Sequence, residues 1–151
     1  MTRARGSPGF TLIEVVAVLA ILAVAAVFVL PAVGRGTAAL RFRAEGGRVA
    51  ALLRDARQQA VSRRQPARVT LDRARSTVAL SIGDAAVPLR QLELSPGLRL
   101  HASSGPESLA FSSRGITRSA RWVLEGPEGR DLAIEIDGIT GRVIVGSRSG
   151  S

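Results

Sequence analysis

The sequence predicts an α+β protein in which a long N-terminal helix packs on a C-terminal antiparallel β domain. Residues 10–30 form a continuous apolar run, and residues 37–65 follow with apolar positions at helical spacing. From residue 66 onward the apolar residues recur with a period of two, in short runs separated by turn residues. The 151 residues leave room for one modest domain beyond the apolar run.

The apolar run has the length of a membrane span. As a helix, residues 10–30 would extend roughly 31 Å, against a hydrocarbon core of about 30 Å. Glu14 lies inside this run, although a charged side chain at the bilayer centre costs roughly 2.5–3.5 kcal/mol. We therefore predict that Glu14 is functional and needs a partner. A signal peptide cut near Ala23-Val24-Ala25 and an ordinary anchor remain as alternatives, but neither explains this carboxylate.

The residues around Glu14 form a specific motif. Gly9-Phe10-Thr11-Leu12-Ile13-Glu14-Val15 resembles the processing and methylation motif of type IV pilins and of the pseudopilins of type II secretion. The resemblance implies that prepilin peptidase removes residues 1–9 as a leader by cutting after Gly9. It also implies that the new terminus, Phe10, is N-methylated, and that the C-terminal domain is periplasmic.

The position of Glu14 suits a role in assembly. It lies four residues from the new terminus, about 6 Å along a helix axis. In a filament of staggered subunits, its carboxylate can meet the α-amino group of a neighbour inside an apolar bundle. Breaking a buried charge pair costs about 3–5 kcal/mol, so the pair can enforce register. We predict that Glu14 is a filament-assembly residue rather than a catalyst.

The second part of the helical region, residues 31–65, begins with helix breakers. Pro31, which matches the helix-kinking proline of pilins, is followed by Gly34 and Gly36, and we expect a kink or a partly melted stretch there. The helix should resume at Thr37. Its apolar stripe should pack on the sheet, and it consists of Phe42, Val49, Leu52, Leu53, Ala56 and Ala60.

Residues 66–146 should form the β domain, and residues 147–151 a disordered tail. Eight strands are predicted, and the last two form a hairpin around Asp137-Gly138. They are Ala67–Leu71, Thr77–Ile82, Val87–Leu94, Leu98–Ala102, Leu109–Phe111, Ala120–Leu124, Leu132–Asp137 and Arg142–Val145.

Two stretches of the β region carry a second resemblance. Residues 109–115 and 132–145 are similar to the C-terminal domain of the GspH/FimT family, which holds H-type minor pseudopilins and FimT minor pilins. The chain lacks the cysteine pair of many type IV pilins and the acidic calcium loop of major pseudopilins. The resemblance therefore implies a minor pseudopilin of type II secretion, anchored in the inner membrane and incorporated near the pseudopilus tip. Its partners would be prepilin peptidase, the major and other minor pseudopilins, and secreted cargo.

The net charge of +9 permits an anionic partner, and every basic residue is arginine. The alternative function is therefore that of a FimT-like minor pilin of a type IV pilus that binds DNA. Five arginines lie shortly before the last hairpin, within it or in the tail: Arg114, Arg118, Arg121, Arg142 and Arg148. Acidic residues are interspersed, however, and no aromatic residues interleave to stack on bases. A solvated basic surface is the preferred interpretation.

No pattern in the sequence predicts an enzyme, a cofactor or a metal site. The chain has one histidine, no cysteine and no tyrosine, and no nucleophile–base arrangement stands out. His101, with no carboxylate nearby in sequence, is expected to be a packing or surface residue. Asp137-Gly138 is interpreted as a turn rather than a calcium loop. Trp122 should lie in the core or on a sheet face.

Overall fold

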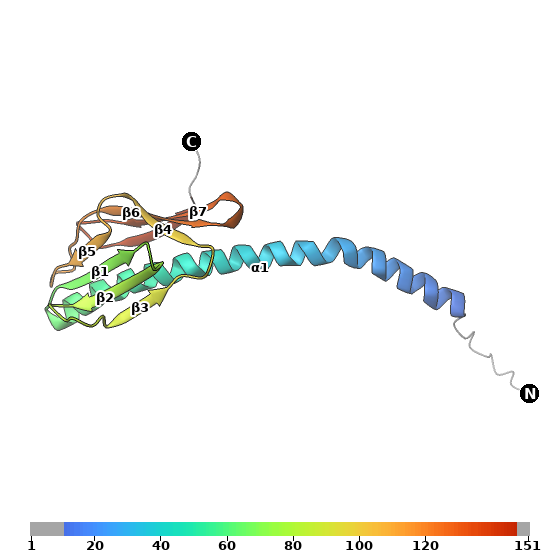
Figure 1. The fold of residues 1–151 in the computed structure, drawn as a ribbon, viewed down its shortest axis with the longest axis horizontal. Coiled ribbons are helices and arrows are strands. Elements are labelled where there is room, and N and C mark those ends of the chain that lie inside the picture. The colour runs from blue at the N-terminus through green and yellow to red at the C-terminus, as the bar shows by residue number, and fades with distance from the viewer. Residues whose placement is uncertain (1–10, 148–151) are drawn as a thin grey trace, which may run out of the picture. The chain divides into compact units, whose positions relative to one another are not determined.

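A computed structural model describes the backbone of residues 11–147 and the side chains of residues 11–26 and 37–146. Helix α1 (Leu12–Arg63) precedes a β region (Figure 1). The strands are β1 (Ala67–Asp72), β2 (Thr77–Ile82), β3 (Arg90–Glu93), β4 (Arg99–Ser104), β5 (Ser108–Phe111), β6 (Ala120–Gly126), β7 (Arg130–Ile136) and β8 (Val143–Ser147). A short 3-10 helix, η1 (Pro127–Gly129), joins β6 to β7. The α+β class and all eight predicted strands are confirmed.

Helix α1 is continuous, which corrects the expectation of a melted stretch at residues 31–36. A proline removes one backbone hydrogen bond, whereas melting several residues would remove many and add two frayed ends. Contacts divide the chain into two compact units between Leu40 and Arg41, so the boundary falls inside α1. Among the described residues, no helix meets the combined length and hydropathy needed to cross a membrane.

The strands form two antiparallel four-stranded sheets. One has the order β3-β2-β1-β5 and the other the order β4-β6-β7-β8. The chain therefore changes sheet at each step from β3 to β6, and these crossings tie the two sheets into one domain. Strand β8 extends to Ser147, which pairs with Leu132. Ser147 is therefore part of a strand, not of the predicted disordered tail, and residues 148–151 lie outside the described part.

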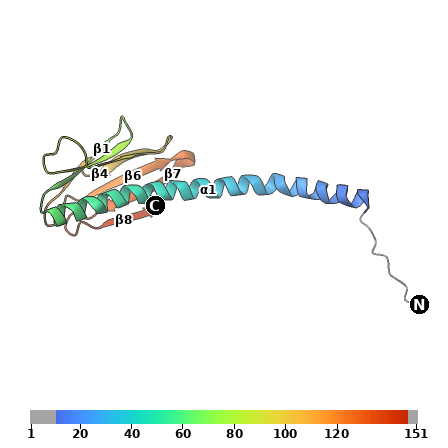
Figure 2. The same ribbon diagram turned by 90° about the horizontal axis from the view of Figure 1, so that it is seen from below.

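The second half of α1 supplies one wall of the core, as Figure 2 shows from below. All six predicted stripe residues are buried, and they join Trp122, Phe111 and Ile134 from the strands in one apolar cluster. Gly46 is the point of closest approach. A Cβ atom placed on it would overlap Cδ2 of Leu132 in β7. The absence of a side chain at residue 46 therefore allows the helix to lie directly on the sheet.

Candidate functional site

The first turn of α1 holds Glu14. Its backbone N–H donates to the carbonyl oxygen of Thr11 at 3.1 Å and lies 3.3 Å from Thr11 Oγ1. A threonine at the N-cap followed by glutamate three residues later is the capping-box sequence. This local signal starts the helix at Leu12 and fixes Glu14 where the helix dipole favours negative charge. Gly9 and Phe10, the predicted processing residues, lie outside the described residues.

The helical surface around Glu14, over residues 11–26, is apolar apart from this residue and Thr11 and is exposed on every side. A helix with no polar face needs other helices or lipid around it, because water solvates such a surface poorly. The exposed large residues of this segment are Leu12, Ile13, Val15, Val16, Val18, Leu19, Ile21, Leu22 and Val24. The arrangement can therefore support assembly through helix packing, with one carboxylate at its start.

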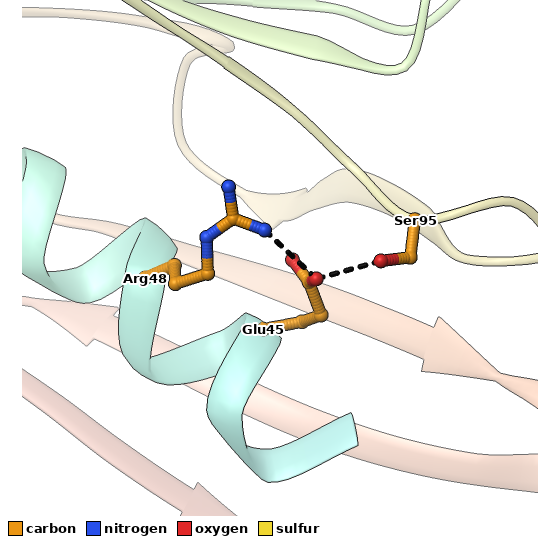
Figure 3. A network of polar contacts seen from close by, with 3 residues as sticks. All are labelled: Glu45, Arg48 and Ser95. Carbon is orange, nitrogen blue, oxygen red and sulfur yellow. Dashed lines mark hydrogen bonds and ion pairs between the residues drawn. The ribbon is translucent and has the colours of Figure 1, made fainter. Parts of the chain in front are cut away.

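Farther along α1, Glu45 is a buried charged residue that the sequence analysis missed. Figure 3 shows its carboxylate between Arg48 and Ser95: Oε1 accepts hydrogen bonds from Arg48 Nη1 at 2.9 Å and Ser95 Oγ at 2.7 Å. Oε2 is buried without a partner among the described residues. Glu45 lies three residues after Phe42 and four before Val49, which places it on the apolar stripe of the helix. A carboxylate at such a position is the sequence signal that could have identified this buried charge.

At the C-terminal end of α1, two loops are joined into one rigid unit, here called the loop platform. It consists of residues 112–119, residues 137–142, and Arg57 and Val61 of α1. Thr117 N–H donates to Gly138 O at 3.0 Å, and Gly138 N–H donates to Ser119 Oγ at 2.9 Å. These reciprocal bonds connect the loop before β6 to the hairpin between β7 and β8.

Close packing under the loop platform fixes it to the helix. A Cβ atom on Gly141 would overlap Gly115 O, and one on Gly115 would approach Arg57 Nε at 3.1 Å and Val61 Cγ2 at 3.2 Å. Both glycines have positive φ, at 65° and 77°. Only glycine meets both requirements without strain, so these two glycines allow the two loops and the helix to pack this closely.

The arginines singled out in the sequence separate into two kinds. Arg114, Arg118 and Arg142 are exposed on the loop platform, and none has a carboxylate within ion-pair distance among the described residues. Arg121 instead pairs with Glu135 across β6 and β7 at 2.5 Å. Arg148 lies outside the described part. Three of the five predicted basic residues therefore lie on the loop platform.

Asp137 is the acidic residue within the loop platform, and it serves the hairpin. Its Oδ1 accepts hydrogen bonds from the N–H groups of Ile139 and Thr140, both at 2.9 Å. The bond from Thr140 and, to a smaller extent, the bond from Ile139 lower the pKa of the Asp137 carboxyl. The positive charge of Arg142 lowers this pKa further. The turn interpretation of Asp137-Gly138 is confirmed.

His101 has a partner that sequence distance concealed. Strand pairing brings its Nδ1 to 3.7 Å from Glu125 Oε1, and both residues line a shallow pocket of about 550 Å³ together with Arg73 and Arg99. Two arginines and one carboxylate line this pocket, so it carries a small excess of positive charge. Within the described residues, no three potential metal ligands come together.

A capped apolar helix with a carboxylate in its first turn, continuing into a two-sheet domain, defines a pilin-like subunit. Comparison with known protein families indicates the same class of protein. The model of the type II transport protein GspH matches residues 45–150, and that of the prokaryotic N-terminal methylation motif matches residues 5–30. The chain therefore belongs to the GspH family.

Solved structures give the same fold at low sequence identity. The type IV minor pilin FimU of Pseudomonas aeruginosa, in two crystal forms, is 20% identical in both, with TM-scores of 0.60 and 0.63. The matches cover 72% and 76% of this chain and 94% of FimU. The minor pseudopilin EpsH of the Vibrio cholerae type 2 secretion system is 12% identical, with a TM-score of 0.56, covering 75% of this chain and 98% of EpsH. A search of curated proteins gives no significant match.

Proposed function

We propose that this chain is a minor pseudopilin of a type II protein secretion system, a structural subunit near the tip of a periplasmic filament. The observation that carries the proposal is the match of residues 45–150 to the type II transport protein GspH, which spans the end of α1 and the whole β domain. In this proposal the protein is no enzyme: it acts by packing and docking.

The proposed assembly route begins in the inner membrane. Residues 10–30 anchor the precursor as a single span, with the β domain in the periplasm, and prepilin peptidase cuts after Gly9. The N-methylated Phe10 then begins a helix whose exposed apolar side chains pack among the helices of other pseudopilins. Glu14 meets the amine of a neighbour there, and because an unpaired buried charge is costly, only the correct stagger is stable.

Two measurements on full-length protein in a host with its secretion genes test this route. Mass spectrometry of the mature protein should find a methylated Phe10, whereas a terminus at Met1 or near Ala26 would contradict the proposal. Glu14→Ala should be processed normally but be absent from sheared filaments. Glu93→Ala, which removes an exposed carboxylate from β3, is the matched control and should be incorporated. Incorporation of Glu14→Ala at the wild-type level would exclude an assembly role for that carboxylate.

A DNA-binding minor pilin of a type IV pilus is the second candidate. It is favoured by the three arginines of the loop platform, which have no carboxylate within ion-pair distance among the described residues. Phosphate binding by such a patch gives steeply salt-dependent affinity. Titration of duplex DNA into the full-length protein in detergent tests this function. Binding at low salt that weakens in Arg114→Gln, Arg118→Gln and Arg142→Gln would support the pilin, and no binding would exclude it.

A further inference from the structure

The loop platform combines positive charge with exposed aliphatic side chains. Ile139, at the tip of the β7–β8 hairpin, is 84% exposed, and Ile116, on the facing loop, is 43% exposed. Val61 of α1 lies against Gly115, the residue before Ile116, and is 42% exposed. Arg114, Arg118 and Arg142 flank these residues in sequence. The surface therefore combines exposed aliphatic side chains with three exposed arginines.

This composition favours a protein partner over a nucleic acid. Phosphate recognition uses arginines but gains little from aliphatic side chains, and the platform has no aromatic residue on which a base could stack. Protein interfaces, in contrast, join an apolar centre to a charged rim and are enriched in arginine. Exposed isoleucines lose contact with water when a partner covers them, which stabilises the complex.

The rigidity of the loop platform supports the same conclusion. The bonds of Gly138 to Thr117 and Ser119 and the packing of Gly141 on Gly115 hold both loops in place without a partner. A surface that is already ordered loses little conformational entropy on binding. The one internal acid, Asp137, accepts hydrogen bonds from the N–H groups of its own turn, and among the described residues it forms no ion pair with the three arginines.

We propose that the loop platform is a docking surface for an acidic, apolar-centred surface of another pilin-like subunit. The inference rests on the proposed function, because the partner it names is a filament neighbour. Carboxylates of that neighbour pair with Arg114, Arg118 and Arg142, while its apolar side chains cover Ile116 and Ile139. Opposite charges at the rim orient the two subunits, and like charges exclude incorrect neighbours.

Photo-crosslinking in intact cells that produce the full-length protein tests the proposal. Ile139→p-benzoylphenylalanine should crosslink to another pilin-like subunit, at a segment that contains several Asp or Glu residues. Val87→p-benzoylphenylalanine, at an exposed site between β2 and β3, is the control for nonspecific capture. A product no stronger than this control, or one mapped to a segment without acidic residues or to a protein that is not pilin-like, would overturn the proposal.

Charge reversal adds a second readout. Arg114→Glu, Arg118→Glu and Arg142→Glu together should lower the crosslinking yield from residue 139 at least about tenfold, because attraction at the rim becomes repulsion. The same charge change at the exposed Arg41, Arg43 and Arg68 should leave the yield unchanged. Equal losses in both triple variants, or recovery of DNA as the crosslinked product, would also overturn the proposal.

The filament fraction separates failure of this inference from failure of the proposed function. If the protein enters filaments but residue 139 captures no acidic subunit, the docking surface is wrong and the structural role stands. If the protein never enters filaments but residue 139 captures an acidic pilin-like subunit, the docking surface stands and the filament role is wrong. Failure of both measurements would overturn both.

Discussion

Arg54 on α1 donates a hydrogen bond from Nη2 to the carbonyl oxygen of Val143, at 3.0 Å. Val143 is the first residue of β8, and 89 positions separate the two residues in the sequence. The bond joins the helix to an edge strand, where backbone acceptors lack a neighbouring strand. The arginine thus satisfies an acceptor of the strand that begins directly after the loop platform.

Arg54→Met should lower the free energy of unfolding by about 1 kcal/mol, because the apolar stem is retained while the hydrogen bond is lost. The melting temperature of the β domain should fall by about 4 °C. Thermal unfolding followed by circular dichroism measures the change. Arg68→Met, at an exposed position in β1, is the control, and equal effects in the two variants would contradict the assigned bond.

Two adjacent glycines of α1 should respond in opposite directions to alanine. Gly46→Ala drives a methyl group into Leu132 and should cost about 1–3 kcal/mol of stability. Gly47→Ala has no heavy atom within 4 Å of the new Cβ and should stabilise the helix by about 0.5–1 kcal/mol. Urea unfolding of both variants measures the difference. Leu132→Ala should be less destabilising in the Gly46→Ala background than in wild type.

Ser95→Ala should destabilise the β domain, because it removes one of the two donors that hold the buried carboxylate of Glu45. A hydrogen bond to a charged group contributes about 1.5–3 kcal/mol. The carboxylate would keep only the bond from Arg48, because its Oε2 is already without a partner among the described residues. Ser103→Ala removes an exposed hydroxyl that donates to Arg121 O and should cost less. If the two variants unfold at the same urea concentration, Ser95 does not stabilise Glu45.

The hairpin at Asp137 should make stability depend on pH in the acid range. The pKa of the Asp137 carboxyl is lower in the folded protein than its ordinary value, so folding favours the ionised form of this carboxyl. That stabilisation is present above the unfolded pKa and is lost as pH falls through the folded pKa. Asp137→Asn keeps an acceptor oxygen but cannot ionise. The stability difference between wild type and this variant should therefore shrink between about pH 6 and about pH 2.5. A pH-independent difference would contradict this assignment.

Local patterns in the sequence predicted the strands of the β domain but not which strands pair with each other. Alternating apolar residues and turn signals located all eight strands, and helical spacing identified the buried face of α1. The division into two sheets, with β5 beside β1 and β4 beside β6, depends on pairings between distant segments that no local pattern encodes. The expectation of a melted stretch at Pro31 was wrong, because the local cost of the proline does not interrupt the longer helix.

Among the candidate sites, one can be identified from local sequence, and the others depend on residues that are far apart in the chain. Glu14 stands out in sequence because a carboxylate within an apolar run is anomalous, and its backbone geometry is set by Thr11 three residues earlier. The loop platform depends instead on Arg57 meeting Gly115 and Gly141, which are far apart in the chain. His101 and Glu125 become neighbours only through the pairing of β4 with β6. Such sites require the tertiary structure.

The border between the two units, at Leu40 and Arg41, cuts through an unbroken ladder of backbone hydrogen bonds. A fragment that starts at Arg41 would therefore open with four N–H groups whose acceptors have been deleted. Fraying from this uncapped N-terminus would reach Glu45 within about one turn. A fragment of the β domain that starts at Arg41 therefore needs a new Ser, Thr or Asp as an N-cap in order to be stable in water.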